Sequence, residues 1–234
     1  DVYKRQVDKE SFVGDPDFVN VPIKGLLSKK HAMQCSKHIL SGTKINIDRI
    51  GQFESKDTTH VSVVDKHGNC VTMTHSLGMP SGAITDGLGF MYNGCMAVFD
   101  PRPGRAGSIE PGKSRFSSLA PTIVTKDSVP YMVLGAPGGT QIAMGILQTI
   151  LNVIEFEMNM LEAVSAPRFS STSNIIDVMK RIPSYVTEGL EELNYDVQRS
   201  ALTFGIAAVH GIRIKDGVMD GGADPGHDGM SLSI

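Results

Sequence analysis

The chain has 234 residues, 41% of them hydrophobic and 20% charged, with a net charge of −3 and a pI near 6.2. These values are typical of a globular chain that is long enough for one sizeable domain, or for one domain plus part of another. No basic stripe or aromatic platform favours nucleic acid as a partner, and no apolar run reaches the length of a membrane-spanning helix.

Residues 1–57 have a mixed texture. The chain begins without an initiator methionine or a signal peptide, which is typical of a truncated reading frame and leaves its compartment unknown. Residues 14–18 predict a turn, and residues 21–39 predict a polar, cation-rich helix that ends near Gly42. Residues 44–57 lack periodicity, so we expect an exposed linker, the kind of segment in which a chain can be cut.

From residue 58 the pattern changes to short strands. Apolar and polar residues alternate in runs that are separated by turn sequences, which is typical of antiparallel hairpins. The segment between the first two hairpins is rich in glycine, proline and serine and has one strand-like run. The predicted strands cover residues 60–65 and 69–76, then 89–92, then 121–126 and 130–135.

The C-terminal part mixes helices and strands. Gly138-Gly139 opens a predicted helix whose apolar positions go nearly all the way round, so we expect it to be covered on most sides. The order of strands, then helices, then strands predicts the α+β class, with helices gathered on one face of an antiparallel sheet. The predicted helices cover residues 140–157, 160–165 and 184–194, and the predicted strands cover 175–179, 204–214 and 218–222.

Cysteine and histidine form no ligand pattern. The three cysteines, Cys35, Cys70 and Cys95, lie far apart, so we expect neither a disulfide framework nor a metal-binding CxxC pair. The seven histidines are dispersed, without an HxH or HxxxH pair. We therefore expect no metal site and no cofactor.

The polar tetrad Asp57-Thr58-Thr59-His60 lies directly before the first predicted strand. If the chain is cut before Thr58, this residue carries a nucleophilic hydroxyl and a free α-amine. The amine, with an ordinary pKa of about 7.7–8, can act as general base for the hydroxyl. These residues alone leave open whether the tetrad is this kind of nucleophile or a polar turn, and whether Thr59 would be the first residue.

Other polar segments offer partners for such a nucleophile. Residues 135–140 follow a strand and begin a helix, so their amides are candidates for an oxyanion hole, although a simple turn fits equally well. Ser76 ends the strand that pairs with the Thr58 strand, where its hydroxyl can orient the nucleophile. Ser117-Ser118 either binds a carboxylate or completes a turn. Asp224 and Asp228 lie in a glycine-rich segment that either binds a ligand or forms a solvated turn, and in isolation the pattern favours the turn.

Three motifs, in this order, resemble the γ-glutamyltransferase family of N-terminal-nucleophile hydrolases. They are TTHVSVVD at 58–65 followed by Gly68-Asn69, SSLAPTIV at 117–124, and GAPGG at 135–139. Shorter segments agree with them, namely GDPDFV at 14–19, AVSAPRF at 163–169 and ADP at 223–225. The resemblance covers nearly the whole chain from about residue 8 onward.

The resemblance implies a four-layer αββα sandwich, of which this chain is a fragment. Residues 1–57 correspond to the end of a large subunit and a linker, and residues 58–234 to the small, catalytic subunit. It further implies a precursor that cuts itself between Asp57 and Thr58, which gives a heterodimer of the two subunits. The implied nucleophile is Thr58. The other implied roles are support of the nucleophile by Ser76, an oxyanion hole of Gly138 and Gly139, and binding of the substrate's α-carboxylate by Ser117 and Ser118.

Two positions depart from the family pattern. Val98 stands where the family has an aspartate that pairs with the α-ammonium of a glutamyl group, and Gly78 stands where asparagine is usual. Asp100 lies two residues beyond Val98, and from that position its carboxylate does not reach the same point as an aspartate at position 98. The first expectation is hydrolysis of γ-glutamyl amides such as glutathione. The alternatives are an amidohydrolase or acylase for a small, oxamate-like amide, and a non-catalytic binding relative.

Overall fold

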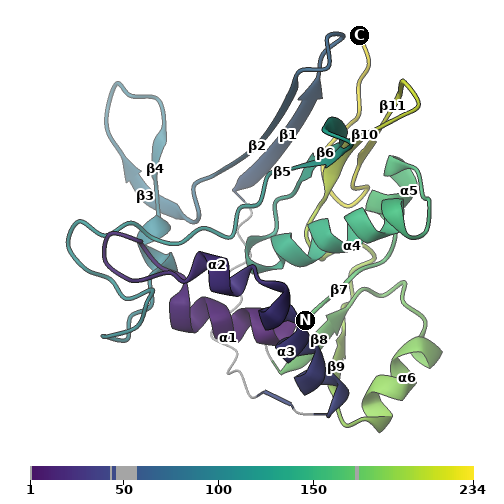
Figure 1. The fold of residues 1–234 in the computed structure, drawn as a ribbon. Helices are drawn as coiled ribbons and strands as arrows, with labels where there is room; N and C mark the ends of the chain where they lie inside the picture. The colour runs from purple at the N-terminus through teal and green to yellow at the C-terminus, as the bar shows by residue number, and fades with distance from the viewer. Residues whose placement is uncertain (1, 43, 46–56, 172–173) are drawn as a thin grey trace.

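The computed structural model describes residues 2–42, 44–45, 57–171 and 174–234 (Figure 1). Most of the linker expected over residues 44–57 therefore lies outside the described residues. The first helix, α1 (Val2–Phe12), was not predicted. The single helix expected over residues 21–39 is wrong, since α2 (Ile23–Leu26) and α3 (Lys29–Leu40) are separate. The Ser28 hydroxyl accepts a hydrogen bond from the His31 amide at 3.1 Å and so starts α3 as its N-cap.

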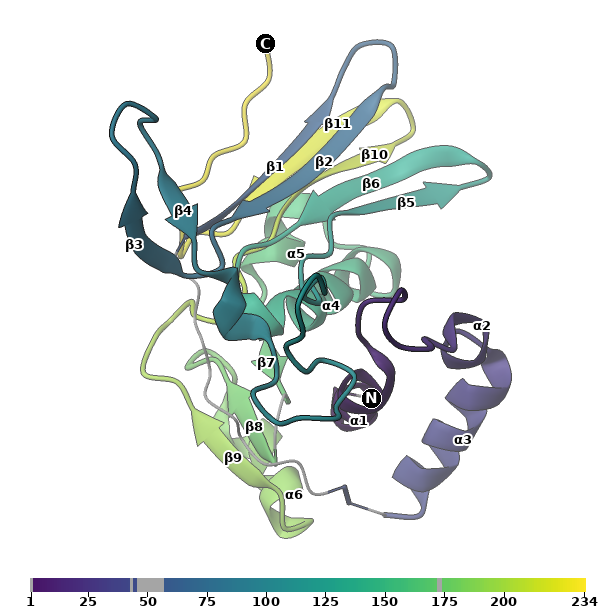
Figure 2. The same ribbon diagram turned by 90° about the vertical axis from the view of Figure 1, so that its left-hand side faces the viewer.

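Two antiparallel sheets lie face to face in the upper part of the view in Figure 2. One is the hairpin of β1 (Thr58–Val64) and β2 (Cys70–Ser76). The other has the strand order β11-β10-β6-β5. Its strands are β5 (Thr122–Lys126), β6 (Val129–Gly135), β10 (His210–Lys215) and β11 (Val218–Ala223).

These strands confirm the three predicted hairpins, with one correction. The last hairpin was expected to start at residue 204, but β10 starts at His210. Ala207, with a φ of 39°, has a left-handed backbone that interrupts an extended strand. The residues before β10 therefore form a buried crossing segment instead of a strand.

The helices α4 (Ile142–Ile154) and α5 (Met160–Ser165) cover the four-stranded sheet on the side away from the hairpin (Figure 2). Their buried side chains form the main core with β6 and the segment before β10. The expectation that α4 is covered on most sides is confirmed, since the exposed part of the helix is one stripe of Leu147, Leu151 and Ile154, which are 41–47% exposed. The core contains Met132, Leu134, Ile142, Ile146, Val153, Met160, Val164 and Val209.

The β1–β2 hairpin turns its polar face inward. Thr58 and His60 are buried against the four-stranded sheet, and the Thr72 hydroxyl donates to the Leu134 carbonyl at 3.1 Å. The apolar residues of the hairpin point outward and are 43–57% exposed, namely Val61, Val63, Val71 and Met73. The α+β class is thus confirmed, and the described residues supply both sheets and one helical layer of the expected sandwich.

Smaller elements surround this body. The strands β7 (Phe169–Ser170), β8 (Ile175–Val178) and β9 (Asp196–Arg199) form a sheet, in which α6 (Ser184–Glu192) connects the parallel pair β8 and β9. The hairpin of β3 (Pro80–Ile84) and β4 (Met91–Asn93) leads into a 3-10 turn over Cys95–Val98. Of these strands, sequence patterning predicted β4 and β8. Within the described residues no helix is long and apolar enough to cross a bilayer.

Candidate active site

Thr58 and Ser76 meet at the open end of the β1–β2 hairpin. They are cross-strand partners in the ladder, and their hydroxyl oxygens lie 2.8 Å apart. The Ser76 oxygen also accepts a hydrogen bond from the Gly78 amide at 2.9 Å, which fixes its side chain. Thr58 is only 6% exposed. The hairpin register therefore holds the Thr58 hydroxyl in one place, with a hydroxyl partner on the neighbouring strand.

Thr58 and Ser76 line a cavity of about 90 Å³. The hairpin, the 3-10 turn after β4, the segment before β5 and the loop before α4 all contribute to its wall. Of the residues expected to bind or stabilise substrate, Ser118 and Gly139 line it, as do the two departures Gly78 and Val98. The rest of its lining is Met79, Gly94, Ala97, Arg115, Phe116, Leu119, Thr140 and Ile142.

The loop between β6 and α4 presents two glycines next to this cavity. Gly138 has a φ of 138° and Gly139 a φ of 57°, conformations that favour glycine. A Cβ on Gly138 would lie 2.6 Å from the Ala207 Cα. In the part of the chain that the structure describes, neither glycine amide donates a hydrogen bond. The loop thus offers unused N–H groups where an amide oxygen can be held.

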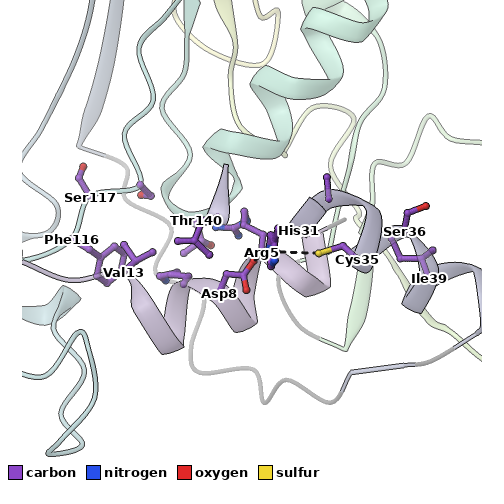
Figure 3. Close-up of a pocket in the computed structure, with 14 residues that line it drawn as sticks. Arg5, Asp8, Val13, His31, Cys35, Ser36, Ile39, Phe116, Ser117 and Thr140 are labelled. Atoms are coloured by element: carbon purple, nitrogen blue, oxygen red, sulfur yellow. Dashed lines mark hydrogen bonds and ion pairs between the residues drawn. The ribbon is translucent and has the colours of Figure 1, made fainter. Parts of the chain in front are cut away.

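Ser117 does not line the cavity that holds Thr58. Its side chain is exposed, and its oxygen accepts a hydrogen bond from the Leu119 amide at 3.2 Å, as in a serine turn. It lines a larger cavity of about 580 Å³ between this segment, α1 and α3 (Figure 3). Phe116, Ser118 and Thr140 line both cavities, so the two adjoin.

The two departures are built into the wall of the cavity. Gly78 has a φ of 71°, and a Cβ there would lie 2.9 Å from the Cys95 sulfur, so a larger residue does not fit. Asp100 does not take the place of the lost aspartate. Its carboxylate accepts hydrogen bonds from Nε and Nη2 of Arg102 at 2.9 and 2.7 Å, and these bonds lower its pKa to about 2.

His60 lies between the sheets, two residues after Thr58. Its Nδ1 lies 2.9 Å from the Thr74 hydroxyl and its Nε2 lies 2.9 Å from the Ser62 hydroxyl. The ring packs on Gly135, where a Cβ would come within 2.3 Å of it. Burial, together with nearby His210, lowers the pKa of His60 to about 4. The imidazole is thus neutral at pH 7 and has a partner on both nitrogens, which indicates a structural role.

The unfolding free energy should therefore depend on pH through His60. Its pKa is about 4 in the folded chain and 6.5 when unfolded, so the unfolded state binds more protons between these values. As the pH falls from 6.5 to 4, we expect a loss of up to about 1 kcal/mol per pH unit, allowing for solvent screening. Denaturant titrations over this range should show a shallower dependence in His60→Gln. If the unfolding free energy of both proteins fell equally with pH, His60 would not be the source of the pH dependence.

A buried ion pair supports the glycine loop from behind, and sequence reasoning did not find it. Asp224 was expected in a solvated turn, but it is 2% exposed and its carboxylate accepts a hydrogen bond from Arg168, itself 1% exposed. Arg168 also donates to the carbonyls of Ile206 and Ala207 at 3.0 and 2.8 Å. Because Ala207 packs on Gly138, the pair holds the segment against which the loop rests.

The sequence carried a signal for this pair. Arg168 and Asp224 lie in two of the short motifs that support the family resemblance, AVSAPRF and ADP, and neither motif had a role. Buried charges are retained in proteins when an opposite charge and hydrogen bonds satisfy them. Two motif residues of opposite charge in apolar surroundings are therefore candidates for a buried ion pair.

The family model of gamma-glutamyltranspeptidase matches residues 1–234. The chain belongs to this family. The glutathione hydrolase proenzyme of Escherichia coli K12 is 32% identical over 236 residues, with 93% of this chain and 40% of that protein covered. The acylase ACY 1 proenzyme of Pseudomonas sp. V22 is 36% identical over 231 residues, with 97% and 41% covered. The chain thus spans about two fifths of the length of these relatives.

Solved structures of the family agree with the fold. The gamma-glutamyltranspeptidase of Pseudomonas nitroreducens complexed with L-DON superposes with a TM-score of 0.69 at 30% identity. The match covers 75% of this chain and 99% of that chain. The expectation of an α+β fragment of the N-terminal-nucleophile hydrolase sandwich is confirmed.

Proposed function

We propose that this chain carries the catalytic centre of a threonine amidohydrolase or acyltransferase that cuts itself between Asp57 and Thr58. Residues 1–57 then end the large subunit, and residues 58–234 form the small one. The observation that carries the proposal is the 2.8 Å contact of the Thr58 and Ser76 hydroxyls at a cavity that Gly139 also lines. The word proenzyme in the names of both relatives fits such a cut.

The proposed reaction uses Thr58 twice. The free α-amine made by the cut accepts the proton of the hydroxyl, whose oxygen attacks the carbonyl carbon of the substrate amide. The amides of Gly138 and Gly139 stabilise the oxyanion, and the C–N bond breaks as the leaving amine takes the proton. Water or a second amine then releases the acyl group from Thr58, which regenerates the hydroxyl.

Two donor classes fit this chemistry. The first is γ-glutamyl amides such as glutathione, which the name of the Escherichia coli relative favours. The second is a small amide without an α-ammonium, which Val98 in the cavity wall and the acylase relative favour. Ser118 lines the small cavity and would contact a donor of either class, whereas Ser117 would contact a group that extends into the larger cavity.

Trapping the acyl-enzyme tests the proposal. The complete protein should be mixed with the p-nitroanilides of glutamate (linked through its γ-carboxyl group) and of glutaric acid, then quenched within one turnover and analysed by peptide mass spectrometry. We expect a mass increase of one acyl group on the peptide that starts with Thr58. Turnover without this adduct would contradict the nucleophile. Absence of turnover with both donors would favour the alternative that this protein is a non-catalytic member of the family that only binds its ligand.

A further inference from the structure

The turn at residues 14–18 contacts the segment that leads into the cavity beside Thr58. Asp15 is buried in this turn, with 8% of its surface exposed. One of its carboxylate oxygens accepts a hydrogen bond from the Ser114 amide at 2.7 Å, and the other accepts one from the Asp17 amide at 3.1 Å. Asp15 and Ser114 are 99 residues apart and lie on opposite sides of the proposed cut. The GDPDFV motif thus makes a contact that the proposed function does not use.

Packing on both sides of this contact holds the turn in the same place. Gly14 lies so close to the neighbouring segment that a Cβ would come within 2.3 Å of the Ala106 carbonyl oxygen. The Lys113 side chain is 1% exposed, and its Nζ lies 5.7 Å from the centre of the Phe18 ring, close enough for a cation–π contact. The turn and residues 106–114 therefore pack together as one unit.

Asp15 accepts these hydrogen bonds as an anion. The bond from the Ser114 amide, followed by that from the Asp17 amide, holds the pKa of its carboxyl group below the ordinary value of 3.8. The group is thus ionised at neutral pH, where both of its oxygens act only as acceptors. Hydrogen bonds from N–H groups to a carboxylate are stronger than those between neutral groups. Asp15 is therefore able to fix the position of the Ser114 amide.

The segment that Asp15 fixes forms part of the wall of the cavity. Residues 113–121 are neither helix nor strand, so no ladder of backbone hydrogen bonds determines their course. Three of the four residues after Ser114 line the cavity that holds Thr58, namely Arg115, Phe116 and Ser118. The position of the Ser114 amide therefore determines where this wall lies relative to the nucleophile.

We propose that Asp15 is a positioning residue for the acyl-donor site and acts through the Ser114 amide. This inference rests on the proposed function of Thr58, and it adds that residues before the cut complete the site after the cut. Without the bond, the segment moves away from the cavity and Ser118 no longer meets the donor. The contact between Thr58 and Ser76 involves neither the turn nor this segment. We therefore expect donor binding to weaken while the reacting groups stay in place.

Asp15→Asn tests the inference in the complete protein. The variant keeps the shape of the side chain, but an NH₂ group replaces one carboxylate oxygen, so one of the two amides loses its acceptor. It should still be cut before Thr58. With the faster of the two p-nitroanilides, we expect KM to rise about 10-fold or more, whereas kcat per cut molecule, counted by intact mass, should stay within about threefold. A rise in KM of less than about threefold would overturn the inference, whatever happens to kcat.

Asp17→Asn is the matched control. Asp17 lies in the same turn, and its replacement makes the same change in net charge, but Asp17 is exposed. The variant also keeps the backbone amide that donates to Asp15. Its KM and kcat should stay within about twofold of those of the unchanged protein. An equal rise of KM in the two variants would assign the effect to the lost charge and would contradict the role of Asp15.

Limited digestion with trypsin separates this inference from the proposed function, because it requires no turnover of a donor. Trypsin cuts after lysine and arginine, and Lys113 and Arg115 flank the fixed amide. Cutting at these two sites should be about 10-fold faster or more in Asp15→Asn than in Asp17→Asn, whereas cutting after Lys126, at the exposed end of β5, should be equal. If neither donor is hydrolysed, the proposed function fails, while faster cutting at these sites still supports the positioning role. Equal cutting at these sites in the two variants would overturn the inference.

Discussion

Replacement of Thr58 by alanine is expected to leave the complete protein as one uncut chain, with amide hydrolysis lowered by about 1,000-fold or more. The reason is that the same hydroxyl performs the proposed self-cleavage and the attack on substrate. It lies 2.8 Å from the Ser76 oxygen. Intact mass and N-terminal sequencing measure the cut, since the unchanged protein should give a small chain that starts at Thr58.

Thr59→Ala is the matched control for this experiment. Thr59 is the next residue on β1, but its side chain is exposed on the outer face of the hairpin. This variant should still be cut before Thr58 and should keep its activity. If Thr59→Ala stayed whole while Thr58→Ala was cut, Thr59 would be the nucleophile. If the unchanged protein stayed uncut after long incubation, neither Thr58 nor Thr59 would act as an N-terminal nucleophile.

The second large effect is expected from Asp224→Asn, which should lower the unfolding free energy by about 3–5 kcal/mol. The substitution keeps the shape of the side chain but leaves the buried guanidinium of Arg168 without its counter-charge. Burial already lowers the pKa of Arg168, and Asp224 opposes that shift. Denaturant titration at pH 7 measures the loss.

Asp220→Asn provides the comparison for that loss. Its carboxylate pairs with Nε of Arg213 at 2.7 Å, but the Asp220 side chain is 31% exposed. Water can therefore replace much of this interaction, and we expect a loss of about 1 kcal/mol. Similar losses in the two variants would mean that burial does not decide the contribution of the Arg168–Asp224 pair.

The elements with a strong local pattern were predictable. Each hairpin alternates apolar and polar residues around a turn sequence, and the strands appear within a few residues of their expected bounds. The alternation does not tell which face is buried, however. In the β1–β2 hairpin the polar face is inside, because Thr72 and His60 find partners between the sheets. The helix expected over residues 21–39 is split because Ser28 caps a new helix, a local bond that outweighs the continuous pattern.

The candidate site was predictable in its motifs but not in its geometry. The hairpin alone placed Ser76 beside Thr58, since cross-strand partners follow from the register. Ser117 and Ser118 are neighbours, but the Ser117 hydroxyl accepts a hydrogen bond from the Leu119 amide and its side chain lines the larger cavity and not the small one. Arg115 lies beside Val98 in that cavity only because the chain folds back after β4, a long-range contact that no local pattern encodes.

The register of the β1–β2 ladder would make self-cleavage depend on correct folding. Thr58 faces Ser76 only when the strands pair as they do here, and a shift by one residue would bring His75 opposite Thr58 and reverse the faces of one strand. If the cut depends on the two hydroxyls, a mispaired precursor cannot make it. The bond before Thr58 then acts as a proofreading device, because only correctly folded molecules release the amine that makes them active.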